Sequence, residues 1–301
     1  ENEAYVIQGG VKVAQELLSL PFNHIYYTGG NAVGKIVMKS AADNFSSVTL
    51  EMGGKSPVIV DETANLENAA KKVAWGRVMN AGQVCVAPEY VIAHESISEK
   101  FSLLVKEQME TLYNSENTGF NKSKYVPRII NNRHTKRIKS LIDDAIRKGA
   151  QTVLGGSVDV EDRFIEPTIL KNMSEEMDIM NEEVFGPVVS LLTYKNRLEV
   201  LEIIEKRANP LALYIYSNNK DNIDFFLDNT SSGSAVINNN CIQAGGNPNL
   251  PFGGVGGSGM GRSGGHRGFV EMSNERSVVH QPLDKFRDFM IQLPPYSDKY
   301  I

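Results

Sequence analysis

The sequence predicts an α/β protein with doubly wound parallel sheets. Short apolar segments typical of strands alternate with segments whose apolar residues recur at helical spacing, and this order repeats along the chain. Successive strand–helix–strand units place their strands parallel in one sheet. The 301 residues, of which 41% are hydrophobic, are enough for about two domains with a sizeable core.

Composition excludes several classes of protein. The net charge of -5, with both signs interspersed, argues against a basic nucleic-acid binder and gives no electrostatic reason to bind anionic membranes. Two cysteines are too few for a disulfide framework, so we expect a reducing compartment. No apolar run reaches the roughly 18 residues of a membrane span. Because Glu1 opens in what reads as mid-domain sequence, we expect the chain to be incomplete at its start.

The first expected elements flank a glycine-containing turn. Apolar residues at helical spacing predict a helix over residues 11–18, which Pro21 ends. A strand from His24 to Tyr27 runs into Thr28-Gly29-Gly30, and a helix follows from about Gly34 to Ala42.

A second strand–helix unit follows this turn. Residues 57–60 form a short apolar strand, and Asn65 is placed to cap the next helix through its side-chain oxygen. The predicted buried face of that helix consists of Leu66, Ala69, Ala70, Val73 and Ala74.

The alternation continues to about residue 238. Helices are expected around 101–109 and 138–146, with Ile138, Leu141, Ile142, Ala145 and Ile146 facing inward and Gly149 as the C-cap of the second. The other expected elements are strands over 90–93, 188–192, 211–216 and 234–238, and helices from Leu198 and Lys220. Eleven of the 26 glycines lie between Gly245 and Gly268, so a close-packed loop is expected there rather than a regular helix.

Several motifs resemble known sites but lack a required part. Residues 29–35 are almost a phosphate-binding loop, but Ile36 has no oxygen to hold magnesium. This turn can still bind a dinucleotide at a helix N-terminus. Residues 254–259 match the dinucleotide fingerprint without its preceding strand, and residues 261–265 match the serine-hydrolase elbow without its strand. The five histidines are scattered, and no metal site is expected.

Three side chains are candidates for chemistry. Cys85 follows a glycine-containing helix exit, where backbone amides can face a reacting atom, whereas Cys241 has no such setting and is interpreted as structural. Glu51 is either an exposed strand residue or a partly buried carboxylate whose raised pKa would suit a general base. Spacing alone favours the exposed position. Glu183, taken alone, lies in a charged turn before a strand.

Five segments nevertheless share one pattern in order and spacing. They are Tyr27-Thr28-Gly29 with Gly34, Leu50-Glu51-Met52-Gly53-Gly54-Lys55-Ser56-Pro57, Gly82-Gln83-Val84-Cys85, Glu183-Val184-Phe185-Gly186-Pro187, and Pro251-Phe252-Gly253-Gly254-Val255-Gly256. In register, they resemble the NAD(P)-dependent aldehyde dehydrogenase family over essentially the whole chain. Residues 28–37 and Pro294-Pro295-Tyr296 are similar to its class 3 and fatty-aldehyde branch.

The resemblance implies a role for each matching residue. Cys85 would be the nucleophile and Glu51 the general base for deacylation. Glu183 would hold the nicotinamide ribose, and Phe185 would pack near the nicotinamide. Gly29, Gly30 and Val33 would line the adenosine-diphosphate end of the cofactor site, and Gly53 would be a further cofactor-binding residue. Asn238 would help to order the active-site region.

The implied reaction is the oxidation of medium- to long-chain aliphatic aldehydes to carboxylates with NAD, with NADP as the alternative cofactor. A thiohemiacetal and then a thioester would form on Cys85, and water activated by Glu51 would hydrolyse the thioester. The implied division is residues 1–53 for the last part of the cofactor domain, 54–265 for the catalytic domain and 266–301 for a bridging or dimerisation segment.

The resemblance also carries expectations about partners and completeness. A homodimer without nucleic acid is expected in the cytoplasm, or on the cytosolic face of an endomembrane through a tail that this sequence lacks. The family's oxyanion asparagine and adenosine-ribose lysine would lie upstream of Glu1. These 301 residues alone are therefore expected not to turn over aldehyde. The alternative is a non-catalytic fragment or structural partner of such an enzyme.

Overall fold

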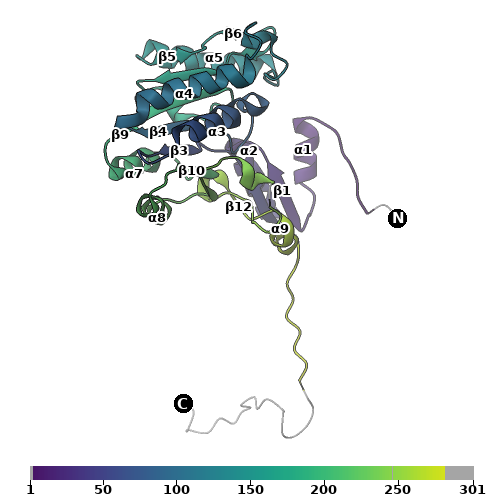
Figure 1. Ribbon diagram of the computed structural model, residues 1–301. Helices are drawn as coiled ribbons and strands as arrows, with labels where there is room; N and C mark the ends of the chain where they lie inside the picture. Colours follow the sequence, from purple (N-terminus) through teal and green to yellow (C-terminus); the bar gives the residue numbers. More distant parts are fainter. Residues whose placement is uncertain (1–2, 246, 282–301) are drawn as a thin grey trace, which may run out of the picture.

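The computed structural model describes residues 3–245 and 247–281, which form a large and a small sheet covered by helices (Figure 1). The predicted α/β fold with parallel sheets is confirmed. In the seven-stranded sheet, all neighbours are parallel except the pair at one edge, β8 and β5. Its order is β11 (Ser234–Ile237), β10 (Ala212–Tyr216), β3 (Pro57–Val60), β4 (Tyr90–His94), β9 (Val188–Tyr194), β8 (Thr168–Lys171) and β5 (Gln151–Leu154).

Helices cover both faces of the large sheet. One apolar cluster packs α3 (Leu66–Val78) and α4 (Glu95–Tyr113) against Val58 and Val60, and a second packs four other helices against Ile59. Successive strand residues point to opposite faces, so burial of both faces explains why β3 is apolar throughout. The helices on the second face are α5 (Asn132–Arg147), α6 (Asp178–Asn181), α7 (Arg197–Glu205) and α8 (Lys220–Asn229).

The small sheet brings the end of the described chain back to its beginning. β1 (His24–Thr28) lies parallel to β2 (Ser47–Glu51), and β12 (Gly259–Met260) lies antiparallel on the other edge of β2. Gly259 has a φ of +139°, and a Cβ there would overlap the carbonyl oxygen of Leu50. Only glycine lets the returning segment approach β2 this closely. The segment around residue 260 therefore lies beside Glu51.

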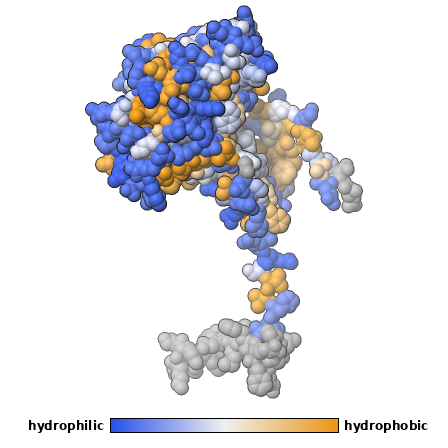
Figure 2. Space-filling view, in the orientation of Figure 1, coloured by the Kyte–Doolittle hydropathy of each residue, from blue (hydrophilic) through white to orange (hydrophobic). Residues whose placement is uncertain are grey.

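Two helices flank the small sheet. α2 (Asn31–Asp43) buries Val37 against Leu50 and Met52, whereas none of the residues of α1 (Val11–Leu18) is buried. Figure 2 shows hydrophobic side chains at the surface around α1. Val6 and Val11 are among the exposed hydrophobic residues there. Within residues 3–245 and 247–281, no helix is long and apolar enough to cross a membrane.

The shorter elements complete the described chain. They are the β6–β7 hairpin (Val158–Asp159 and Phe164–Ile165), 3-10 turns over Met79–Gly82, Phe120–Lys122, Ile242–Ala244 and Gly256–Ser258, and α9 (Gly265–Glu271).

Two predicted helix ends are confirmed in detail. The Asn65 side chain accepts a hydrogen bond from the Asn68 amide and so caps α3. At the end of α5, the amide of Ala150 donates to Ala145 and the amide of Gly149, with a φ of +104°, donates to Ile146. This is the pair of bonds by which a left-handed glycine closes a helix.

Three expectations about helices are wrong. Ile146 is 45% exposed, because it lies at the edge of the apolar face of α5 rather than within it. α2 begins at Asn31 rather than near Gly34, because Gly30 is extended and already precedes the first turn. α9 forms where no regular helix was expected. Gly264 and Gly265 precede or open it with positive φ, so the glycines make the sharp entry and do not interrupt the helix.

Candidate active site

One cavity of about 910 Å³ gathers most of the residues singled out in the sequence. Its walls come from the ends of β1 and β2, the turn after α3, the start of α5 and the segment before β9. A cavity of this size is in the range of small-molecule and cofactor sites. The implied site residues that line it are Gly29, Gly30, Glu51, Gly53, Cys85, Glu183 and Phe185.

Two implied residues do not line this cavity. Val33 lies on the solvent side of α2 and is 48% exposed. The side chain of Asn238 bonds both the amide and the carbonyl oxygen of Ser217, across the ends of β10 and β11. Its placement therefore supports the large sheet rather than the cavity.

Cys85 is presented by a tight backbone turn. Asn80, Ala81 and Gly82 all have positive φ, and a Cβ on Gly82 would overlap the carbonyl oxygen of Gly186. The turn thus ends α3 abruptly and packs against the segment that carries Glu183. The Cys85 side chain is left half-buried on the cavity wall.

The surroundings of Cys85 oppose its ionisation. Burial, and then the negative charges of Glu183 and Glu51, raise the pKa of the thiol. Hydrogen bonds from the backbone amides of Cys85 and Val86 lower this pKa, but by less. The resting thiol is therefore protonated at neutral pH, and a nucleophilic attack needs a base in the same cavity.

Cys241 has a different environment. It is 9% exposed, and its sulfur hydrogen-bonds the carbonyl oxygen of Val86 at 3.6 Å. Its amide donates to the Tyr214 hydroxyl, and burial raises the pKa of the thiol to about 11. This thiol is a packed part of the core, in agreement with the structural interpretation.

Glu51 is a buried carboxylate at the end of β2. It is 5% exposed, so the exposed position favoured by spacing is wrong and the buried alternative is right. The Ser263 hydroxyl donates to its Oε1 at 3.2 Å, whereas Oε2 is buried without a hydrogen-bond partner. Burial raises the pKa of Glu51. The hydrogen bond from Ser263 and the charge of Arg262 lower this pKa, but by less than burial raises it. A carboxyl group of raised pKa suits proton transfer near neutral pH.

Glu183 packs directly against the backbone at Gly53. A Cβ at this glycine would overlap the Glu183 carboxylate, so no larger residue fits without moving it. Burial, and then the charge of Glu89, raise the pKa of Glu183 to about 7, although the hydrogen bond from the Gly54 amide lowers it. Phe185 follows at the cavity wall, 37% exposed and with a φ of +49°.

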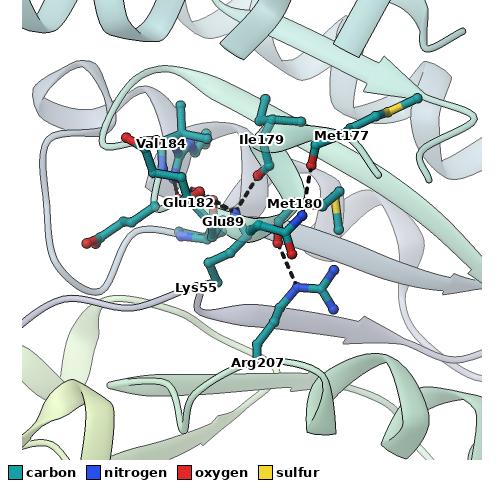
Figure 3. Close-up of polar contacts among 12 residues, drawn as sticks. Lys55, Glu89, Met177, Ile179, Met180, Glu182, Val184 and Arg207 are labelled. Carbon is teal, nitrogen blue, oxygen red and sulfur yellow. Dashed lines mark hydrogen bonds and ion pairs between the residues drawn. The ribbon is translucent and has the colours of Figure 1, made fainter. Parts of the chain in front are cut away.

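A buried ion cluster holds the segment that carries Glu183 (Figure 3). Glu89 accepts hydrogen bonds from Lys55 at 3.0 Å, Arg77 at 2.6 Å and the amide of Val184 at 2.6 Å. Lys55 also donates to the carbonyl oxygens of Ile179 and Glu182. Burial raises the pKa of Glu89, but the charges of Arg77 and Lys55 outweigh it and hold that pKa below its ordinary value.

The sequence reasoning missed this cluster. Lys55 and Glu89 each lie just before a strand, β3 or β4, whose first four residues are all buried. A charged residue beside such a strand needs a buried partner, and this was the available signal.

Glu89→Gln is expected to lower the free energy of unfolding by about 3–5 kcal/mol, because it leaves Lys55 and Arg77 buried without a counter-charge. Glu99→Gln is the matched control. Glu99 pairs with Lys171 at 2.9 Å on the surface, and such exposed pairs contribute at most about 1 kcal/mol. Urea unfolding of both variants measures the difference, and equal small losses would contradict a stabilising role for the cluster.

Basic side chains line another part of the cavity. His134 and Arg137 lie one turn apart near the start of α5, a spacing that places both on one face of the helix. Arg137 donates to the carbonyl oxygens of Glu183 and Val184. Lys206 and Arg207 complete this group, which sequence reasoning also missed.

The cavity can accept a dinucleotide by its shape and donors. Gly30, Asn31 and Ala32 line it at the N-terminus of α2, where the first amides have no partner within the helix and favour phosphate oxygens. No group of three or more His, Cys, Asp or Glu side chains that could hold a metal occurs among the described residues. A thiol and a buried carboxylate in one cavity are suited to acyl transfer.

Comparisons with known proteins agree with this geometry. The model described as "Aldehyde dehydrogenase family" matches residues 4–278. The 4,4'-diaponeurosporen-aldehyde dehydrogenase of Staphylococcus aureus is 39% identical over 299 residues, which are 99% of this chain and 63% of that protein. "Aldehyde dehydrogenase, dimeric NADP-preferring" of Rattus norvegicus is 40% identical over 295 residues, covering 98% of this chain and 63% of that protein.

Solved structures show the same fold. A substrate-bound state of Staphylococcus aureus AldH has a TM-score of 0.89 and 38% identity, covering 98% of this chain and 62% of that chain. An indole-3-acetaldehyde dehydrogenase complexed with NAD+ has a TM-score of 0.78 and 29% identity, covering 86% and 52%. The chain thus spans less than two thirds of the length of the relatives that it matches.

Proposed function

The chain belongs to the aldehyde dehydrogenase family, and we propose that it carries the thiol and the base for oxidation of aliphatic aldehydes of medium to long chain. The observation that supports this most directly is the convergence of Cys85, Glu51 and Glu183 on one cavity, from segments far apart in the sequence. A structural partner without catalysis would not need a buried and a half-buried carboxylate beside a half-buried thiol. The chain-length preference rests on the similarity of residues 28–37 to the fatty-aldehyde branch.

NAD is the proposed cofactor, with NADP as the alternative. One relative is named NADP-preferring, and one similar structure contains NAD+. The backbone at Gly29 and Gly30 would hold the diphosphate, Glu183 would hold the nicotinamide ribose, and Phe185 would pack beside the nicotinamide. When bound, the nicotinamide supplies the acceptor for the hydride that the substrate carbon loses.

Cys85 is assigned to the first half of the reaction. The thiol proton passes through water in the cavity to solvent, and the sulfur bonds to the aldehyde carbon. The carbonyl oxygen gains negative charge in this step, and the backbone amide of Cys85 is a donor for it. After the substrate carbon has lost its hydride, Cys85 holds a thioester.

Glu51 is assigned to the second half of the reaction. Its carboxylate takes a proton from water, and the oxygen of that water bonds to the thioester carbon. The carbon–sulfur bond then breaks, so that the carboxylate product leaves and the electron pair returns to Cys85. A thiolate suits both halves because it attacks well and leaves well.

Incubation of the complete protein, rather than of these 301 residues alone, with NAD and hexanal tests the proposed function, with NADH followed by its absorbance. Formation of NADH together with hexanoate supports oxidation of the aldehyde to the acid. Unchanged absorbance in a protein that binds NAD would contradict it.

The affinity for NAD+ is expected to rise as the pH rises through about 7. The pKa of Glu183 is raised to about 7, so the side chain is neutral below that pH and a carboxylate above it. A carboxylate accepts hydrogen bonds from ribose hydroxyls more strongly than the neutral acid, by about 1 kcal/mol or roughly fivefold in Kd. Calorimetric titration measures this dependence. The Glu183→Gln variant should bind NAD+ more weakly, and its affinity should not change with pH in this range. An equal pH dependence in the variant would show that Glu183 does not bind the ribose.

The proposed assembly is a homodimer in the cytoplasm or at the cytosolic face of an endomembrane. Val278 and Val279 are 64% and 87% exposed after α9, which supports a bridging role for this part of the segment 266–301. The proposed division into cofactor and catalytic domains at residues 53 and 54 falls between β2 and β3.

A further inference from the structure

The Glu51 carboxylate is contacted unequally at its two oxygens. Oε1 accepts a hydrogen bond from the Ser263 hydroxyl at 3.2 Å, whereas Oε2 is buried and has no hydrogen-bond partner. The Tyr26 hydroxyl, from the neighbouring strand β1, interacts with both Ser263 and Glu51. One oxygen is thus held by the protein, and the other is left for a proton from another source.

Ser263 is itself fixed by its backbone. Its amide donates to the carbonyl oxygen of Phe252 at 2.6 Å, and its carbonyl oxygen accepts from the Phe252 amide at 2.8 Å. Its hydroxyl can also donate to the Phe252 carbonyl oxygen at 3.3 Å, so its one proton is shared between that oxygen and Oε1 of Glu51. This pair of backbone bonds places the hydroxyl beside Glu51 independently of any hydrogen bond between the two side chains.

The residues before Ser263 hold the same loop from the other side. The Arg262 guanidinium donates to the carbonyl oxygens of Gly254 at 2.6 Å and Gly261 at 2.7 Å. Gly261 has a φ of +79°, and a Cβ there would overlap the Glu271 carboxylate, which also accepts a hydrogen bond from Thr49 on β2. The loop is therefore tied to the strand that carries Glu51, through contacts that do not involve Glu51 itself.

We propose that Ser263 is a positioning residue for Glu51: its hydroxyl holds Oε1 and leaves Oε2 to receive the proton of the attacking water. The inference rests on the proposed function of Glu51 and deepens it. Ser263 is the serine of the segment 261–265, which matches the serine-hydrolase elbow without its preceding strand. The inference gives this serine a role other than that of a nucleophile. Ser263 acts only through the carboxylate and forms no bond to the substrate.

The test uses p-nitrophenyl acetate, an activated ester that acylates a thiol without any cofactor. Release of the first nitrophenolate reports acylation of Cys85, and the steady rate that follows reports hydrolysis of the acyl-enzyme. In Ser263→Ala, we expect an unchanged first phase and a steady rate lowered about 10-fold or more, the size of one lost hydrogen bond to a carboxylate. Ser263→Thr keeps a hydroxyl and should restore most of the steady rate.

Ser258→Ala is the matched control for a loop that is merely loosened. Ser258 is fully buried in the same loop, and its hydroxyl bonds only the backbone of Val255, at 2.9 and 3.0 Å. Loosening of the loop should change both phases together in this variant. A drop confined to the steady phase in Ser263→Ala supports the positioning role, provided that Ser263→Thr recovers it.

Two results overturn the inference. One is a steady rate in Ser263→Ala equal to that of the wild type, and the other is a parallel loss of both phases in Ser263→Ala. Failure of the proposed function looks different, because the wild-type protein would then form no NADH from NAD and hexanal whatever residue stands at position 263.

Discussion

In the complete protein, Cys85→Ser is expected to abolish aldehyde oxidation, whereas Cys241→Ser is expected to keep most of it. A serine hydroxyl is a much weaker nucleophile and a poorer leaving group than a thiol, so the loss should be on the order of 10³-fold or more. Cys85 lies half-buried on the cavity wall, but the Cys241 sulfur is buried against the Val86 carbonyl oxygen. A hydroxyl at position 241 can donate to the same carbonyl oxygen.

The comparison is made on the purified variants by steady-state NADH formation with hexanal. Circular dichroism and NAD binding show whether each variant is folded, so that lost activity is not confused with lost structure. Comparable losses from both substitutions would remove Cys85 from the role of nucleophile.

Glu51→Gln is expected to complete one turnover and then stall. The amide cannot take a proton from water, so the thioester on Cys85 should accumulate after the hydride has left. The expected time course is a rapid formation of NADH, up to the concentration of the enzyme, followed by little steady rate.

Glu16→Gln is the control for this substitution. Glu16 lies exposed on α1, and the same change of charge there should leave steady turnover intact. Full steady turnover in Glu51→Gln would show that another group activates the water.

The fold was largely predictable because local patterns and tertiary packing agree along most of the chain. Residues 57–60 are apolar throughout because helices cover both faces of β3. The Asn65 side chain caps α3 by accepting a hydrogen bond from the amide of Asn68, three residues later, so the local sequence is enough to predict it. The small strand β12 and α9 escaped prediction. Their glycines, such as Gly259 and Gly265, form close contacts with segments that are distant in the sequence, which no local pattern reveals.

Most residues of the cavity wall that the resemblance singled out could be named from the sequence, but their environment could not. The segments around Glu51 and Cys85 pointed to both side chains, yet the burial of Glu51 depends on β12 and Ser263, more than 200 residues later. The same holds for the bond from the Val184 amide to Glu89, between segments 95 residues apart. Val33 was assigned to the site by resemblance, and its exposed place on α2 could be seen only in the structure.

The roles of Cys85 as nucleophile and Glu51 as base are tested most directly by the mass of Glu51→Gln after reaction with NAD and hexanal. One hexanoyl group is expected to replace one thiol hydrogen, and peptide mapping should place this thioester on Cys85. NADH formation without any acyl adduct, or an adduct on Cys241 alone, would contradict these roles.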